Sequence, residues 1–217
     1  MNTLITQKNE LKFELKQPQF DFIFSTAQFP AYIAAIGTGK TTSLIERAII
    51  LSRAPNNLGV IIRKEFTNLR DSTMRDFELY TGLKISHDTK EVKLSNGSVI
   101  MFRHGDEIPV LKNLNLGWFA MEQAEEFGDG IAFEMLIQRL RRKVPFRSGF
   151  LIANANGHNW IYDKWIKNGA PENHLTVQAT TYDFADILPS DYIKNLEQNL
   201  PKNLFQRYVM NSHEIAE

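Results

Sequence analysis

A glycine-rich turn between an apolar run and an amphipathic stretch constrains the fold of this chain more than any other feature. The run Ala31–Ile36 is compact and apolar, which predicts a buried strand. After the turn, Lys40–Ser52 places its apolar residues on one helical face. The turn itself, residues 37–42, reads GTGKTT. A strand, a glycine-rich turn and a helix in this order predict an anion-binding loop.

This turn follows the second half of the P-loop pattern G-x-x-x-x-G-K-[ST], with Ala34 in place of the first glycine. Gly37 and Gly39 let backbone N–H groups turn inward around an anion at a helix N-terminus. In a P-loop, the lysine reaches the terminal phosphates and the hydroxyl after it coordinates Mg²⁺. Against the plainer alternative of a turn that happens to carry a lysine, the sequence predicts a triphosphate bound by Gly37, Thr38, Gly39, Lys40, Thr41 and Thr42, with Thr41 on the metal.

Strands and helices are predicted to alternate along the chain. Besides residues 31–36, strands are predicted at 59–63, 116–121, 150–153 and 174–179, and helices at 19–26, 40–52, 66–80, 131–142 and 160–167, with two short helices at the end. Asn96-Gly97 between two alternating stretches is a strong hairpin signal. The pattern predicts an α/β fold with a mostly parallel central sheet, flanked by helices, and a β-hairpin insertion.

A cluster of acids follows the predicted strand at 116–121. A P-loop enzyme needs a carboxylate at a strand end near Mg²⁺, and Glu122 has that position. The next residue is Gln123, which positions water but is a very poor proton acceptor. Glu125 or Glu126 must then supply the general base. The alternatives are an ordinary strand-end carboxylate for Glu122 and a solvated face for the other two.

Composition excludes several classes of protein. The chain of 217 residues has 25 basic and 25 acidic side chains, so nucleic-acid binding requires a local basic patch. The absence of cysteine excludes disulfides, thiolate metal sites and a cysteine nucleophile. The N-terminal stretch has no apolar signal-peptide core, and no apolar run is long enough to span a bilayer. We expect an intracellular protein without membrane association.

Three motifs in order, GTGKTT, LGWFAMEQAEEF and LIANANGHNW, resemble the ATPase domain of the large terminase subunits of tailed bacteriophages. The resemblance runs from about Leu15 to Tyr208 and implies a P-loop NTPase of the ASCE type (additional strand, catalytic glutamate). It implies Mg²⁺-dependent ATP hydrolysis that drives double-stranded DNA into a viral procapsid. In the family, a glutamine after a proline recognises adenine, which Gln19 matches, and Asn154 matches the motif that couples hydrolysis to movement.

The sequence departs from the family pattern at three positions. Ala155 stands where proline is common, and Ile36 stands where a basic residue often contacts phosphate. Gln123 stands at the usual catalytic glutamate, which leaves the identity of the base open between Glu125 and Glu126.

The resemblance also implies an organisation and a set of partners. We expect one ATPase domain over residues 1–217, with an adenine-side segment at 1–30, a core at 31–180 and a helical segment at 181–217. No family-type nuclease domain is expected in this chain. The implied partners are double-stranded DNA, the portal protein, the small terminase subunit and further copies in a ring, in the host cytoplasm at the procapsid.

Hydrolysis at a subunit interface usually requires an arginine that neutralises charge on the transferred phosphoryl group. Arg70 and Arg139 are the two candidates favoured here, and for each the alternative is a solvated or ion-paired side chain. The basic run at residues 139–147 has two further explanations, which are contact with DNA phosphates and a favourable helix C-terminus.

Two other functions fit the same motifs. A helicase-like, nucleic-acid-dependent ATPase normally has Asp-Glu where this chain has Glu122-Gln123. A nucleotide-binding assembly module that does not hydrolyse ATP is compatible with Gln123. Strand separation by the purified chain favours the first, and tight ATP binding without phosphate release favours the second.

Overall fold

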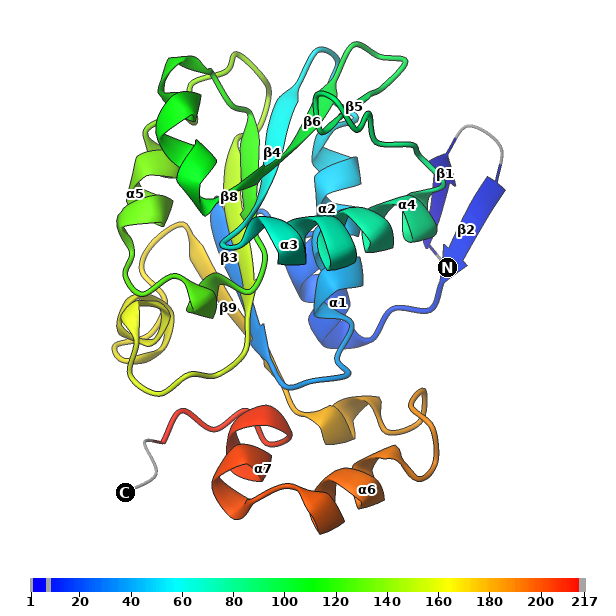
Figure 1. Ribbon diagram of the computed structural model, residues 1–217, viewed down its shortest axis with the longest axis vertical. Helices are drawn as coiled ribbons and strands as arrows, with labels where there is room; N and C mark the ends of the chain where they lie inside the picture. Colours follow the sequence, from blue (N-terminus) through cyan, green and yellow to red (C-terminus); the bar gives the residue numbers. More distant parts are fainter. Residues whose placement is uncertain (1, 7–8, 215–217) are drawn as a thin grey trace.

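A seven-stranded sheet organises the chain, and the computed structural model describes residues 2–6 and 9–214 (Figure 1). The strand order is β5-β6-β4-β7-β8-β3-β9. Every neighbouring pair is parallel except β5 and β6, which are antiparallel. The strands are β3 (Phe29–Ala34), β4 (Leu58–Arg63), β5 (Glu91–Lys93), β6 (Val99–His104), β7 (Trp118–Met121), β8 (Ser148–Ala153) and β9 (His174–Ala179).

The strand order agrees with the predicted class. The P-loop follows β3, the acidic cluster follows β7, and β8 lies between these two strands. An additional strand between the P-loop strand and the acidic strand is the defining feature of ASCE-type P-loop NTPases, so this prediction is confirmed. Because parallel strands share their direction, the ends of β3, β4, β7 and β8 meet at one edge of the sheet, here called the carboxyl edge.

Helices cover both faces of the sheet, with α1, α2 and α4 on one side and α5 on the other (Figure 1). Buried residues form one apolar core on each face, which is the layered arrangement expected of an α/β fold. The helical elements are α1 (Gln17–Ile23), α2 (Lys40–Leu51), α3 (Phe66–Asn68), η1 (Leu69–Met74), α4 (Arg75–Thr81), η2 (Gly105–Asn113), η3 (Ala124–Glu126), α5 (Ile131–Ile137), η4 (Tyr162–Ile166), η5 (Thr181–Phe184), α6 (Tyr192–Asn199) and α7 (Lys202–Tyr208).

A buried arginine fixes α1 against α2. Arg47 is 1% exposed, and its guanidinium donates hydrogen bonds to the carbonyls of Phe22, Ile23 and Ser25 at 3.0, 2.9 and 3.0 Å. These carbonyls lie at the end of α1, where the helix leaves backbone acceptors unpaired. Arg47 therefore satisfies the helix end and holds α1 beside the P-loop helix.

The two ends of the chain form separate additions to the sheet. Strands β1 (Asn2–Thr6) and β2 (Asn9–Phe13) make an antiparallel hairpin. At the other end, α6 and α7 lie below the carboxyl edge in Figure 1. Ile36 donates its backbone N–H to the Tyr208 carbonyl at 2.8 Å, and the Thr181 hydroxyl donates to the Ile36 carbonyl at 2.8 Å. The C-terminal helices are thus tied directly to the P-loop.

The predicted hairpin and one predicted helix show where local signals succeed and fail. Val92 lies opposite Ile100, and Gly97 has a φ of 83°, so the hairpin prediction is confirmed. The helix predicted at 131–142 ends at Ile137 instead. The chain turns there because the Arg139 carbonyl accepts a hydrogen bond from Leu116, just before β7.

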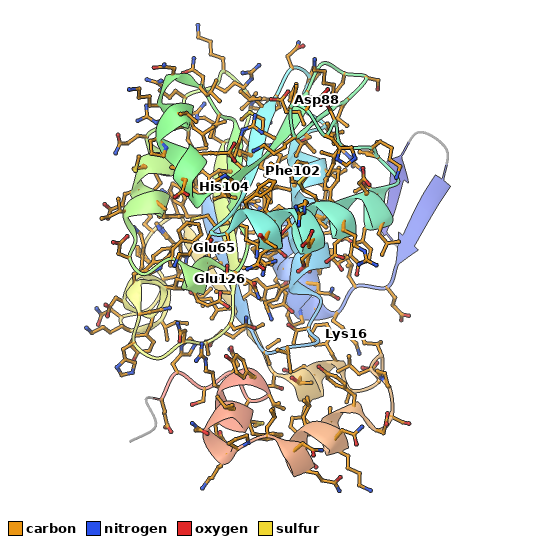
Figure 2. All side chains as sticks on the ribbon, in the orientation of Figure 1. Lys16, Glu65, Asp88, Phe102, His104 and Glu126 are labelled. Atoms are coloured by element: carbon orange, nitrogen blue, oxygen red, sulfur yellow. The ribbon has the colours of Figure 1, made fainter. Side chains whose placement is uncertain are left out.

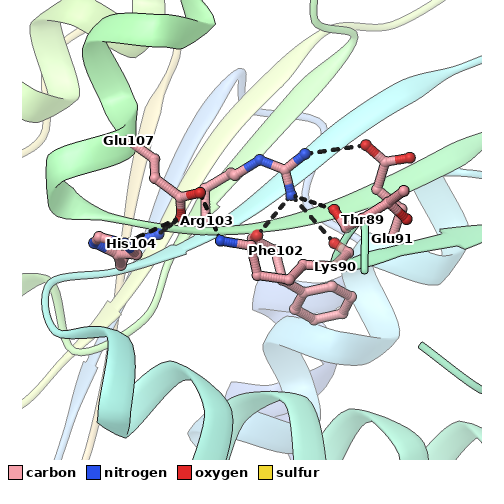
Figure 3. Close-up of polar contacts among 7 residues, drawn as sticks. All are labelled: Thr89, Lys90, Glu91, Phe102, Arg103, His104 and Glu107. Carbon is pink, nitrogen blue, oxygen red and sulfur yellow. Dashed lines mark hydrogen bonds and ion pairs between the residues drawn. The ribbon is translucent and has the colours of Figure 1, made fainter. Parts of the chain in front are cut away.

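The 3₁₀ helix η2 has no counterpart among the predicted elements, and polar contacts attach it to the outer edge of the sheet (Figure 3). Glu107 accepts from the Lys90 amine at 2.6 Å and from the backbone N–H of His104 at 2.9 Å. Arg103 pairs with Glu91 on the neighbouring strand at 3.0 Å. Pro109 lies within η2 and hides its helical signal.

Within residues 2–6 and 9–214, no helix combines the length and the apolar composition that crossing a bilayer requires.

Candidate functional site

The P-loop turns tightly between β3 and α2. Gly37 and Gly39 have φ values of 75° and 67°, in the left-handed region that glycine tolerates best. The Lys40 amine donates hydrogen bonds to the carbonyls of Ala34 and Ala35 at 2.9 and 2.6 Å. Burial lowers the pKa of Lys40 to about 8, while the charge of Glu125 acts in the opposite direction. The loop therefore holds a buried amine at the start of a helix.

The C-terminal segment and Thr38 stabilise this turn. The Thr38 hydroxyl donates to the Ala35 carbonyl at 2.7 Å, and the Thr38 carbonyl accepts from the Tyr32 hydroxyl at 2.8 Å. A Cβ atom added to Gly37 would lie 3.2 Å from the Leu188 side chain. The turn is thus packed on its outer side, while Thr42 is half-buried on the first turn of α2.

A direct hydrogen bond joins the P-loop to the acidic cluster. The Thr41 hydroxyl donates to Glu122 Oε1 at 2.9 Å. Glu122 is 2% exposed at the end of β7, and the hydroxyl of Thr73 donates to its other oxygen. Burial raises the pKa of the Glu122 carboxyl, while the bond from Thr73, the charge of Arg63 and the bond from Thr41 act in the opposite direction. The predicted metal residues Thr41 and Glu122 are therefore in contact.

Gln123 faces an arginine at the end of β4. Its backbone is left-handed, with a φ of 47°, and its side-chain oxygen accepts a hydrogen bond from the Arg63 guanidinium. The same guanidinium lies 3.5 Å from a Glu126 oxygen and 4.0 Å from Glu122 Oε2. Arg63 therefore contacts three members of the acidic cluster, and Gln123 is one of its acceptors.

Glu125 and Asn154 meet across the carboxyl edge. The Asn154 amide donates to Glu125 Oε1 at 2.6 Å. Burial raises the pKa of Glu125, and the bond from Asn154 and the nearby charge of Lys40 oppose that shift. Among the described residues, three buried oxygens here have no hydrogen-bond partner: Glu125 Oε2, Glu126 Oε2 and Asn154 Oδ1. Such atoms are costly unless something polar binds them.

Glu126 lies at the lower part of the sheet, below Glu65 and His104, in the view of Figure 2. It belongs to the short helical turn η3, as Glu125 does. Glu126 is directed to Arg63 and Glu125 to Asn154 and Lys40, so the two neighbouring acids have different surroundings.

Gln19 lies against the P-loop. A Cβ atom on Gly39 would be 2.4 Å from the Gln19 amide nitrogen, so only glycine fits beside this side chain. The amide donates to the Ser43 hydroxyl at 3.5 Å, and its oxygen accepts from the backbone N–H of Lys16 at 3.1 Å. The glutamine thus links α1 to the loop.

The two arginines favoured from the sequence lie outside this cluster. Arg70 is exposed and pairs with its neighbour Asp71 at 2.6 Å. Arg139 donates to the Lys112 carbonyl at 2.6 Å, and its own carbonyl accepts from Leu116 at the amino end of β7. The carboxyl edge is therefore roughly 20 Å away, at about 3.3 Å per residue. The basic run at 139–147 lies at this amino end too.

Two residues of the cluster were not chosen from the sequence. Arg63 ends a buried strand, much as Glu122 follows one, and this shared position is the signal that could have identified it. Thr73 lies on the buried stripe of the helix between Leu69 and Phe77. A hydroxyl in the middle of an apolar stripe is the corresponding signal there.

The cluster fits a divalent cation held jointly with phosphate. Mg²⁺ prefers oxygen ligands and usually combines one or two protein ligands with phosphates and water. The Thr41 hydroxyl and the Glu122 carboxylate are such ligands. The described ranges hold no group of three or more His, Cys, Asp or Glu arranged for a metal ion. Phosphate oxygens would therefore have to complete the coordination shell.

Comparison with known proteins agrees with this arrangement. Residues 26–211 match the family described as phage terminase large subunit. No curated protein sequence matches the chain significantly.

Solved structures share the fold at low sequence identity. The large terminase ATPase domain of Thermus phage P74-26 has a TM-score of 0.72 and 13% identity, covering 93% of this chain and 95% of that one. The full large terminase of another thermophilic bacteriophage has a TM-score of 0.81 and 11% identity, covering 94% and 55%. That of bacteriophage HK97 has a TM-score of 0.64 and 12% identity, covering 92% and 51%. The chain thus spans about half the length of the last two. The second of these three terminases is also solved with ADP and with ATP-gamma-S.

Proposed function

Because this chain belongs to the phage terminase large subunit family, whose members are DNA-packaging motors, we propose that it hydrolyses ATP with Mg²⁺ to drive double-stranded DNA into a viral procapsid. The observation that carries the proposal is the hydrogen bond of 2.9 Å between Thr41 and Glu122. It brings the end of the P-loop and a buried strand-end carboxylate together, which is the arrangement that Mg²⁺-nucleotide chemistry needs. The complexes of a thermophilic bacteriophage terminase with ADP and ATP-gamma-S support adenine nucleotides as ligands.

The P-loop is the proposed phosphate site. Backbone N–H groups of residues 37–42 surround the β- and γ-phosphates, and the positive end of the α2 dipole stabilises their charge. Lys40 moves its amine from the Ala34 and Ala35 carbonyls to the terminal phosphates. Gln19, which lies against Gly39, contributes to the adenine side of the site.

Thr41 and Glu122 are the residues that would hold Mg²⁺, Thr41 directly and Glu122 directly or through water. The cation supplies charge neutralisation on the phosphates when it is bound. Glu122 already accepts hydrogen bonds on both oxygens, which fix the carboxylate in one orientation.

Glu125 is the proposed general base. It accepts a proton from the attacking water as the water oxygen bonds to the γ-phosphorus and the bond to ADP breaks. Its Oε2 is buried without a partner among the described residues, and burial raises its pKa toward the range useful for a base. Glu126 pairs with Arg63 instead and is the weaker candidate. Asn154 reports the state of the γ-phosphate through its bond to Glu125.

An arginine from a second copy of the chain would complete the site. Arg70 and Arg139 both have side chains on the protein surface, outside the P-loop cluster, so either would act on a neighbouring subunit. This places the chain in a ring, with double-stranded DNA, the portal protein and the small terminase subunit as partners, at the procapsid in the host cytoplasm.

The test is phosphate release from Mg²⁺-ATP over a series of protein concentrations, with Lys40→Ala as the control. We expect turnover that Lys40→Ala abolishes, and a steep rise with concentration if an arginine acts between subunits. Release that Lys40→Ala leaves unchanged would contradict the site. Adding double-stranded DNA tests coupling, and strand separation would favour the helicase-like alternative over packaging.

One observation favours a second function, a nucleotide-binding module that does not hydrolyse ATP. Gln123, at the usual position of the base, is held by Arg63 and accepts no proton. Tight ATP binding without phosphate release, even with DNA and portal added, would support this module over the motor.

A further inference from the structure

We propose that Thr73 is a positioning residue that holds Glu122 for Mg²⁺ binding, an inference that rests on the function proposed above. Thr73 is 0% exposed and lies on the helical segment after β4. Its neighbours on the buried face of that segment, Leu69 and Phe77, are apolar. A buried hydroxyl in such a place is costly unless it is hydrogen-bonded, so its partner explains its presence.

That partner is Glu122. The two oxygens of this carboxylate accept hydrogen bonds from two threonines on different helices, Oε1 from Thr41 on α2 and Oε2 from Thr73 on η1. Thr41 directly follows the P-loop lysine, whereas Thr73 lies far from the P-loop in the sequence. Thr73 therefore fixes the side of Glu122 that faces away from the P-loop and leaves Oε1 directed toward it.

The backbone around Thr73 is an independent indication. Residues Leu69–Met74 form a π-helical turn between the α-helical segments α3 and α4. Such turns are rare and occur frequently at functional sites, because they sacrifice regular hydrogen bonding for a particular side-chain direction. Here the widened turn carries the hydroxyl that contacts the buried carboxylate.

Removing the hydroxyl would leave Glu122 Oε2 without its threonine donor, with the Arg63 guanidinium at 4.0 Å as the nearest remaining cation. The carboxylate would then turn toward Arg63 and away from Thr41. Outer-shell partners of metal ligands typically contribute a factor of about 10–100 in metal affinity. The change should thus weaken Mg²⁺ binding with little effect on contacts to the nucleotide itself.

The experiment compares Thr73→Val, which keeps the shape and removes the hydroxyl, with Thr73→Ser, which keeps the hydroxyl. Thr81→Val is the matched control, since Thr81 is a buried threonine of the adjoining helix whose hydroxyl donates to the Phe77 carbonyl at 2.6 Å. Affinity for a fluorescent ATP analogue is measured by titration in EDTA and at increasing Mg²⁺. Phosphate release is measured over the same Mg²⁺ series.

We expect Thr73→Val to raise the Mg²⁺ concentration needed for half-maximal tight binding about 10- to 100-fold, with affinity in EDTA unchanged. Thr73→Ser and Thr81→Val should keep the wild-type Mg²⁺ dependence. A wild-type Mg²⁺ dependence in Thr73→Val, or an equal loss of affinity with and without Mg²⁺, would overturn the inference. If Thr73→Val does not fold, Thr73→Ala takes its place in the same comparison.

The outcome for the wild-type chain separates this inference from the proposed function. A wild-type chain that binds no nucleotide even with Mg²⁺ would overturn both. A wild-type chain with Mg²⁺-dependent binding that Lys40→Ala removes would support the function, and the Thr73 variants would then decide the inference alone.

Discussion

Asn154 donates a hydrogen bond of 2.6 Å to Glu125 Oε1, and this contact connects the end of β8 with the turn after β7. The other oxygen of Glu125 is buried without a partner among the described residues. The charge of Lys40 acts on the same carboxylate. Of the two acids that the sequence left as alternatives, Glu125 is thus the one associated with both the P-loop lysine and the asparagine after β8.

The first prediction concerns these two acids. Glu125→Gln should lower single-turnover phosphate release by roughly 100- to 10,000-fold, because a positioned base contributes that much, while Glu126→Gln should cost less than about tenfold. Binding of a fluorescent ATP analogue should persist in both variants. An equal loss in the two variants, or a greater loss in Glu126→Gln, would show that the base is not Glu125.

The second prediction concerns Arg63. Its side chain is 9% exposed, and Arg63→Ala would leave the buried Glu122 carboxylate without its neighbouring cation. Loss of one partner of a buried ion pair costs about 3–5 kcal/mol of unfolding free energy. Urea denaturation measures the change, and Arg70→Ala is the control, since its exposed pair with Asp71 should give no measurable shift. Equal midpoints for Arg63→Ala and wild type would refute the prediction.

The third prediction concerns the pH dependence of stability. Burial raises the pKa of Glu46 from 4.5 to about 7, and Oε1 of this side chain is buried without a hydrogen-bond partner in the described part of the chain. The folded protein therefore retains a proton that the unfolded chain releases. For this group, stability decreases as the pH rises from about 4.5 to about 7 and stays low above that range.

Glu46→Gln removes this titration. The variant should be more stable than wild type above pH 7 and close to wild type near pH 4.5. The measurement is the free energy of unfolding in urea at both values of pH. A difference between variant and wild type that stays constant across the range would contradict the role given to Glu46.

The fourth prediction concerns packing between β4 and β7. A Cβ atom on Gly59 would lie 1.8 Å from Trp118, whereas nothing lies within 4 Å of a Cβ on Gly128. Gly59→Ala should destabilise the fold by at least about 1–3 kcal/mol, because the indole is fully buried and has no room to move. Gly128→Ala should unfold like wild type. Thermal unfolding compares the two, and similar melting temperatures would argue against the packing constraint.

Much of the fold followed from local patterns. The strand predicted at 174–179 is β9 at the same residues, and the hairpin around Gly97 has the register that its turn requires. Helix ends were less predictable, since α5 ends at Ile137 through a hydrogen bond to Leu116, far away in the sequence. An amphipathic pattern fixes which residues face the core, but it does not contain the contact that ends the helix.

For the site, the sequence by itself determined the P-loop and the strand-end carboxylate Glu122. Both are local features: a glycine turn between a strand and a helix, and an acid where a buried strand ends. Their chemistry depends on backbone conformation within a few residues, which short patterns encode.

Only the tertiary structure decided which side chains meet at the carboxyl edge. The strand order places β8 beside both β3 and β7, so Asn154 meets Glu125, and the segment after β4 brings Arg63 and Thr73 to Glu122. The same geometry places Arg139 at the opposite edge. Strand order results from packing two apolar layers over the whole sheet, and no local pattern carries that information.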